Sequence, residues 1–177
     1  MGSRLARTLG HAFIVAAVAV AGSGSSAQPW ATTEVSPLRC PLDGAYDPAN
    51  PFARIVRGEL PVSLVAEDAT VMAFIPLGWQ HPGHALVVPK RAVRVLSDLN
   101  DAEIVAVMRM VKRVAVAQQR AFGSTGYTLE QNNGRHQEVC HAHFHVIPNT
   151  PGTSVTRATR GEMDAVSARL RGAMPPP

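Results

Sequence analysis

One seven-residue segment constrains the fold of this chain more than any other feature. Histidines alternate in it with small or apolar residues, and it reads His141-Ala142-His143-Phe144-His145-Val146-Ile147. Successive side chains of a β-strand point to opposite faces of a sheet. The alternation therefore predicts a strand over residues 139–147, with an apolar face against a core and three imidazoles on the other face.

Three imidazoles on one strand face indicate chemistry. An imidazole titrates near neutral pH, so such a cluster can supply a neutral nucleophile for phosphorus together with protonated donors for phosphate oxygens. Neutral imidazole is also the commonest metal ligand, so a metal site on His141, His143 and His145 is an alternative. An exposed polar strand face with no chemical role is the third possibility.

The remaining patterns predict an antiparallel α+β domain. The longest helix is expected between Asn100, an N-cap with Glu103 three residues later, and Gly123. A helical turn over residues 52–58 and a last helix over about residues 161–170 complete the helices. Strands are expected over residues 62–67, 70–75, 84–89, 127–131 and 139–147.

The composition is that of one folded domain. The chain has 177 residues, of which 46% are hydrophobic and 17% charged. This is enough for a single core and unlike the composition of disordered chains. The formal net charge is +4, the basic residues are scattered, and only 5% of residues are aromatic. These values fit a partner that carries phosphate and exclude a nucleic-acid-binding surface.

Residues 1–27 read as a secretory signal peptide. A basic start precedes an apolar run over residues 12–21, and Ser25 and Ala27 occupy the small-residue positions of a cleavage site. The apolar run is too short for a bilayer span, which needs about 20 residues, so no stable membrane span is expected. We expect cleavage after Ala27 and a secreted or periplasmic protein, with an irregular lead-in over residues 28–51.

The histidine segment resembles the signature of the histidine triad (HIT) family, in which histidines alternate with apolar residues in the same order. The resemblance covers about residues 40–149, and residues 52–177 are expected to form the HIT-like domain. It implies an antiparallel sheet of about five strands with two main helices, usually as a homodimer. Further segments are similar in order and approximate spacing, namely IVRGELP at 55–61, VMAF at 71–74, PGH at 82–84, LVVPK at 86–90 and Asn132-Asn133-Gly134.

The resemblance also implies chemistry at the α-phosphate of a nucleotide. By motif position His143 is the nucleophile, His141 and His145 flank it, and His84 completes the site. A nucleotidyl-histidine would form on His143 and then be hydrolysed by water, with no metal or other cofactor. The expected substrates are nucleoside phosphoramidates or dinucleoside polyphosphates.

The chain departs from the family at several positions. Many members bind the nucleotide ribose with an acidic residue or Asn, and Pro76 occupies that position here. Gln137 and Asn133 are candidate substrate-binding residues, although their turn is shorter than in the family. Some members hold a structural zinc ion, but Asp43 and Ala92 replace two of its four ligands, so no metal is expected.

The two cysteines replace that metal in our interpretation. In zinc-bearing members the first cysteine lies near the first triad histidine, which would bring Cys40 close to Cys140. Together with export, the resemblance predicts a Cys40–Cys140 disulfide, worth on the order of 4 kcal/mol in the chain-entropy model. Two thiols in a protein that stays in the cytosol are the alternative.

Three functions follow from these alternatives. The first is a HIT hydrolase or transferase that acts on phosphoramide or phosphoanhydride bonds. The second is an exported metal-binding protein that uses His141, His143 and His145, and the third is a nucleotide-binding module without turnover. Metal retained after dialysis favours the second function, and binding without hydrolysis favours the third.

Overall fold

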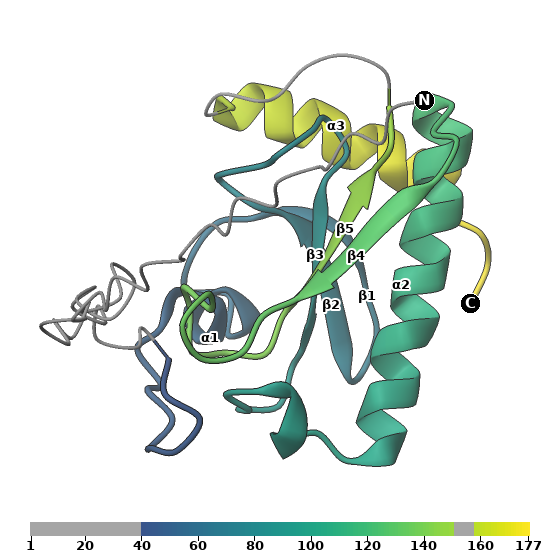
Figure 1. The fold of residues 1–177 in the computed structure, drawn as a ribbon. Coiled ribbons are helices and arrows are strands. Elements are labelled where there is room, and N and C mark those ends of the chain that lie inside the picture. Colours follow the sequence, from purple (N-terminus) through teal and green to yellow (C-terminus); the bar gives the residue numbers. More distant parts are fainter. Residues whose placement is uncertain (1–39, 151–157) are drawn as a thin grey trace, which may run out of the picture. The chain divides into compact units, whose positions relative to one another are not determined.

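The computed structural model of this protein describes residues 40–150 and 158–177, which Figure 1 draws as a coloured ribbon. The predicted signal peptide over residues 1–27 and the lead-in up to residue 39 lie outside the described residues. Within the described ranges, no helix is long and apolar enough to cross a membrane.

The described residues form an α+β domain, as predicted. Its strands make one antiparallel sheet in the order β1-β2-β3-β5-β4. The expected sheet of five strands and the two main helices are therefore confirmed. In chain order the elements are α1 (Pro51–Val56), β1 (Ser63–Glu67), β2 (Val71–Ile75), β3 (Ala85–Pro89), the 3-10 helix η1 (Leu96–Asp98), α2 (Asp101–Phe122), β4 (Tyr127–Gln131), β5 (Phe144–Pro148) and α3 (Arg160–Ala173).

The sheet is covered on both faces, because β2 and β3 are apolar and buried at every position. In β2, Val71, Ala73 and Ile75 pack with residues of α2 and α3. Met72 and Phe74 point the other way, into a smaller cluster with residues of α1. Helices α2 and α3 therefore cover one face and α1 lies against the opposite one (Figure 1).

Helix α2 begins and ends where its sequence predicts. The Asn100 side chain accepts a hydrogen bond from the amide of Glu103, and the Glu103 carboxylate accepts one from the amide of Asn100. Gly123 closes the helix with a positive φ of 65°, which a residue without a Cβ adopts at little cost. The buried stripe against the sheet is Val107, Met110, Val111, Val114, Ala117 and Gln118.

The strand that carries the histidines is shorter than predicted. β5 starts at Phe144, so His141 and His143 lie in irregular chain before it. The amide of Ala142 donates to the carbonyl oxygen of Val93, in the loop after β3, instead of joining the sheet. The predicted strand over residues 139–147 is therefore wrong in its first half. The apolar side chains between the histidines do pack beneath α2 as predicted, namely Ala142, Phe144 and Val146.

Candidate active site

Four histidines line one pocket on the α1 face of the sheet. His84 lies directly before β3, His143 directly before β5, and His145 within β5, where it pairs with Leu86. His136 belongs to the turn between β4 and β5 and lies exposed at the pocket. The pocket volume is about 300 Å³, and its lining residues are Phe52, Gly78, Gln80, His84, Leu86, Glu130, Asn132, His136, Glu138, Val139, His143 and His145.

His143 has the geometry of a nucleophile. It is only 4% exposed, and its Nδ1–H donates to the carbonyl oxygen of His141 at 2.7 Å. A neutral imidazole carries one proton, so this bond leaves the lone pair on Nε2. Phe52 packs edge-on against the His143 ring at 5.1 Å between centroids. Burial lowers the pKa of His143, because the imidazolium would lose hydration, so the ring is neutral at pH 7.

Both ring nitrogens of His141 bond to protein groups. Its Nε2–H donates to the carbonyl oxygen of Pro89 at 2.8 Å, so its Nδ1 accepts from the hydroxyl of Tyr46 at 2.6 Å. Burial lowers the pKa of His141 to about 4, although the bond to Pro89 favours the protonated form. His141 is absent from the described pocket lining, and its contribution is the carbonyl oxygen that orients His143.

His84 and His145 form a directed pair. The amide of Gln80 donates to Nδ1 of His84 at 3.0 Å, so His84 carries its proton on Nε2. That proton is donated to Nδ1 of His145, also at 3.0 Å, which leaves an N–H on Nε2 of His145. Burial, reinforced by neighbouring histidines, lowers the pKa of His84 to about 3 and that of His145 to about 4.

The pocket therefore holds a lone pair and a donor side by side. The rings of His143 and His145 are 5.1 Å apart between centroids. Both are neutral at pH 7, whereas the sequence pattern suggested protonated flanking donors, because burial disfavours the charged form. A neutral N–H still donates a hydrogen bond, so the arrangement suits attack on phosphorus with support for an oxygen of the same group.

Two carboxylates line the same pocket. Burial lowers the pKa of the His143 and His145 rings, and the carboxylates oppose this effect. Glu138 raises the pKa of His143, and Glu130 and Glu138 raise that of His145. Each carboxylate therefore stabilises positive charge on the ring that it faces. This matters at His143, because an imidazole that has bonded to phosphorus through Nε2 while keeping Nδ1–H is cationic.

The two predicted substrate-binding side chains have structural partners. Gln137 is fully buried, and its Nε2 donates to the carbonyl oxygens of Arg94 and Val139. Asn133 accepts a hydrogen bond from the amide of Leu96 through its Oδ1. In the described structure neither side chain lines the pocket. The structure thus brings His84, His143 and His145 together but leaves Gln137 and Asn133 outside.

Other residues contribute that the sequence reasoning did not assign to the site. In the loop after β2, Gly78 and Gln80 line the pocket, whereas Pro76 is not among the described lining residues. Phe52 of α1 also lines it, and Tyr46 bonds to His141 from the predicted irregular lead-in. The sequence contains one pattern that predicts regular structure at the end of this lead-in, because Asn50 followed by Pro51 is a typical helix start.

The two cysteine side chains are in contact. Cys40 is buried, Cys140 is half-buried, and both are thiols that hydrogen-bond to one another. Burial raises the pKa of Cys40 to about 12, the bond to Cys140 acts in the same direction, and the Arg94 guanidinium opposes it. The disulfide between them stays a prediction.

The histidines are not arranged around a common metal position. Among residues 40–150 and 158–177, no three His, Cys, Asp or Glu side chains are grouped so as to hold a metal ion. His141 uses both ring nitrogens in bonds within the protein, so it has no lone pair left for the metal ion of that alternative.

Comparisons with known proteins find several that are similar to this chain. A family model described as the HIT domain matches residues 57–152. The adenosine 5′-monophosphoramidase of Schizosaccharomyces pombe is 39% identical over 99 residues, which is 55% of this chain and 71% of that protein. The purine nucleoside phosphoramidase of Escherichia coli is 34% identical over 103 residues, 56% of this chain and 87% of that protein. A Hit-like protein of Bartonella henselae superimposes with a TM-score of 0.70 at 35% identity, over 74% of this chain and all of that one.

Proposed function

The chain belongs to the histidine triad (HIT) family, and from this premise we propose that it is a nucleotide hydrolase that cleaves nucleoside phosphoramidates through a nucleotidyl-histidine on His143. The observation that carries the proposal is the neutral His143 ring, whose Nδ1 is held by a carbonyl oxygen while Nε2 keeps its lone pair. The phosphoramidases named among its relatives support the choice of bond. Dinucleoside polyphosphates are the second substrate class, in which the same attack breaks a phosphoanhydride bond.

The first step forms a bond between Nε2 of His143 and the α-phosphorus. The phosphorus–nitrogen bond of the substrate breaks, its electron pair goes to the departing amine, and that nitrogen takes a proton from water. The N–H on Nε2 of His145 donates to a phosphoryl oxygen, with His84 holding the other side of the ring. The carbonyl oxygen of His141 stabilises the cationic His143 through the bond to Nδ1–H.

The second step returns the enzyme to its starting state. A water oxygen attacks phosphorus, the bond to Nε2 breaks, and its electron pair returns to His143. The water releases one proton to solvent, which balances the proton taken up by the leaving amine. The products are a nucleoside monophosphate and an amine.

The experiment compares the wild-type protein with His143→Ala on adenosine 5′-monophosphoramidate and on a diadenosine polyphosphate, without added metal. We expect turnover by the wild type and a loss of at least about 10³-fold in the variant, as for other covalent nucleophiles. Acid quenching of the wild type should trap an adenylate on the protein, assigned to His143 by mass spectrometry.

Equal thermal midpoints of the two proteins serve as the control for folding. Substantial turnover by His143→Ala contradicts the assignment of the nucleophile. Binding of nucleotide by the wild type without turnover of either substrate contradicts the hydrolase and leaves the nucleotide-binding module.

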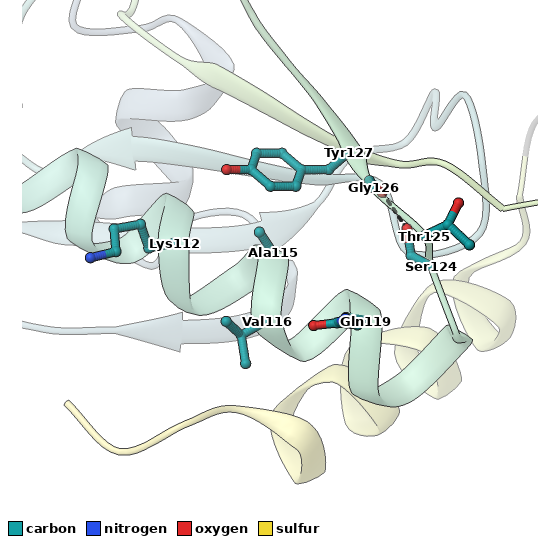
Figure 2. A pocket seen from close by; sticks show the side chains of 8 residues that line it. All are labelled: Lys112, Ala115, Val116, Gln119, Ser124, Thr125, Gly126 and Tyr127. Carbon is teal, nitrogen blue, oxygen red and sulfur yellow. Dashed lines mark hydrogen bonds between the residues drawn. The ribbon is translucent and has the colours of Figure 1, made fainter.

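We also propose that the protein is a homodimer that pairs along β4. β4 is the last strand in the sheet order, and Tyr127 and Leu129 on it are 47% and 43% exposed. An edge strand with exposed apolar side chains is suited to pairing with another chain. Figure 2 shows the pocket beside it, between α2 and the start of β4, where the Tyr127 ring lies near Lys112 and Ala115.

Light scattering tests the dimer. We expect twice the monomer mass for the wild type and the monomer mass for Leu129→Asp, because a buried unpaired carboxylate at a dimer interface is unfavourable. Leu77→Asp in the loop after β2 is the control, since Leu77 is 62% exposed and lies on neither β4 nor α2. A monomeric wild type contradicts the proposal.

A further inference from the structure

The segment of residues 40–50, called here the strap, lies outside the region matched by the family model, residues 57–152. It is nevertheless tied to the histidine region. The main chain of Cys40 forms an antiparallel bridge with Gly134, in the turn before the triad. The buried Arg94 guanidinium donates to two successive carbonyl oxygens of the strap. These contacts hold the strap against the loops that carry the site.

Tyr46 of the strap makes a directed bond to His141. The distance between its hydroxyl oxygen and Nδ1 of His141 is 2.6 Å, and the two rings meet edge-to-face at 5.7 Å. The proton of His141 is on Nε2, where it is donated to the carbonyl oxygen of Pro89. Nδ1 therefore has only a lone pair, and the Tyr46 hydroxyl is the donor.

The backbone of His141 links this bond to the nucleophile. The His141 ring is fixed at both nitrogens, and its carbonyl oxygen accepts the Nδ1–H of His143 at 2.7 Å. Rotation of the His141 ring or protonation of its Nδ1 would disturb that carbonyl and place a positive charge beside His143. A like charge there would make the attacking lone pair less available.

The strap also leads directly into the wall of the pocket. Burial raises the pKa of Tyr46, and the side chain of Asn50 is close enough to its hydroxyl to act in the opposite direction. Asn50 also caps α1 by accepting from the amide of Ala53. Two residues after that cap, Phe52 packs against the ring of His143. Tyr46 is therefore next to both groups that hold the His143 ring in place, namely His141 and the start of α1.

We propose that Tyr46 is a positioning residue, whose hydroxyl fixes the orientation of the His141 ring through Nδ1 and thereby keeps His143 aligned for attack. This inference rests on the proposed function for its kinetic consequence. Its structural part, the hydrogen bond from Tyr46 to Nδ1 of His141, is independent of any activity. The strap would thus be part of the active site, although it lies outside the region that the family model matches.

The kinetic experiment compares Tyr46→Phe with Tyr127→Phe in the full chain. Each variant loses one hydroxyl, and these are the two tyrosines of the chain. For Tyr46→Phe we expect kcat on adenosine 5′-monophosphoramidate to fall by about 10-fold with KM within about twofold, because misalignment acts on the attack rather than on binding. For Tyr127→Phe we expect wild-type values, because the variant keeps the exposed apolar ring on β4 and Tyr127 is outside the described lining of the histidine pocket.

A second measurement reads the tautomer directly. Two-bond ¹H–¹⁵N correlation spectra of ¹⁵N-histidine-labelled protein should give an Nε2–H tautomer for His141 in the wild type. In Tyr46→Phe the Nδ1 resonance should move downfield, as an acceptor nitrogen does when it loses its donor. The resonances of His84 and His145 should keep their wild-type positions and serve as the internal control.

The outcomes separate the two proposals. Wild-type kcat in Tyr46→Phe overturns the inference even if the thermal midpoint falls, since that pattern marks a purely structural tyrosine. An unchanged Nδ1 resonance of His141 overturns it as well. A wild-type protein without turnover contradicts the proposed function, and the spectra then still decide whether Tyr46 donates to Nδ1 of His141.

Discussion

At the scale of single residues, the chemistry of the pocket depends on which nitrogen of each imidazole carries the proton. Main-chain groups decide this at three positions. The carbonyl oxygen of Pro89 accepts from the His141 ring, and the carbonyl oxygen of His141 accepts from the His143 ring. The amide of Gln80 donates to the His84 ring. Because carbonyl and amide groups do not titrate near neutral pH, these tautomers persist over the range in which an enzyme works.

Among the glycines that the structure describes, Gly83 combines a positive φ with the closest contact to an added Cβ. Its φ is +95°, and an added Cβ would lie 2.8 Å from the ring of Phe122. We expect Gly83→Ala to lower the free energy of unfolding by about 1–3 kcal/mol, measured by urea denaturation. Gly172→Ala in α3 is the matched control, because a Cβ there meets nothing within 4 Å. Equal stability of the two variants would contradict the clash at Gly83.

At the scale of elements, the strap and the triad segment depend on one another. Cys40 and Tyr46 of the strap contact Cys140 and His141, which are neighbours in the sequence. Sequence patterns predicted no regular structure in the strap, and none is needed, because its order comes from contacts with distant loops. The strap, which has no periodic sequence pattern, therefore contacts the triad segment through its own side chains.

The two cysteines predict a redox-dependent bond between these elements. With oxidised glutathione, we expect Cys140 to attack the disulfide as a thiolate and release one glutathione thiolate. Cys40, after losing its proton to solvent, then displaces the second, so glutathione disulfide takes both electrons. The bond would stabilise the fold by on the order of 4 kcal/mol. Thiol titration before and after oxidation measures whether the disulfide has formed.

The control for this experiment is Cys140→Ser. In this variant the oxidised protein should lack the internal bond and keep the thermal midpoint of the reduced wild type. Two titratable thiols in the wild type after oxidation would count against the disulfide.

At the scale of the whole molecule, burial of neutral histidines makes stability depend on pH. The pKa values of His84, His141 and His145 are lowered by burial to about 3, 4 and 4 from an ordinary value near 6.5. The unfolded chain therefore binds more protons between pH 6.5 and 4. Stability should be fully present above about pH 6.5 and should fall as the solution is acidified, by up to about 1.4 kcal/mol per pH unit for each histidine.

Urea denaturation between pH 7.5 and 4.5 measures this dependence. His84→Gln should reduce the slope by about one proton equivalent, since a glutamine does not titrate. A slope that is the same in His84→Gln and in the wild type would show that His84 is not held neutral.

Export is a prediction about the whole chain. When the full chain is produced in a Gram-negative host, we expect a periplasmic protein whose first residue is Gln28, read by N-terminal sequencing. Replacing the apolar run at residues 12–21 with polar residues should keep the protein in the cytosol. Cytosolic wild-type protein that retains residues 1–27 would refute the prediction.

The sequence by itself determined the class of the fold and pointed to three histidines, His84, His143 and His145, that line one pocket. Alternation around His143 and the caps at Asn100 and Gly123 are local patterns, and local backbone geometry converts them into a strand end and a helix. The family pattern located His84, which lies far from His143 in the chain. The strand end and the helix could be predicted because periodicity and capping motifs are properties of neighbouring residues, whereas His84 was identified from the resemblance alone.

Only the tertiary structure decided how the site is built. It started β5 at Phe144 rather than earlier, because the chain before it bonds to the loop at Val93. It directed Gln137 into the interior and brought Tyr46 to His141 across 95 positions of sequence. Hydrogen bonds between distant segments leave no periodic trace in a single sequence, so the tautomers and the supports of the nucleophile became visible only in the folded chain.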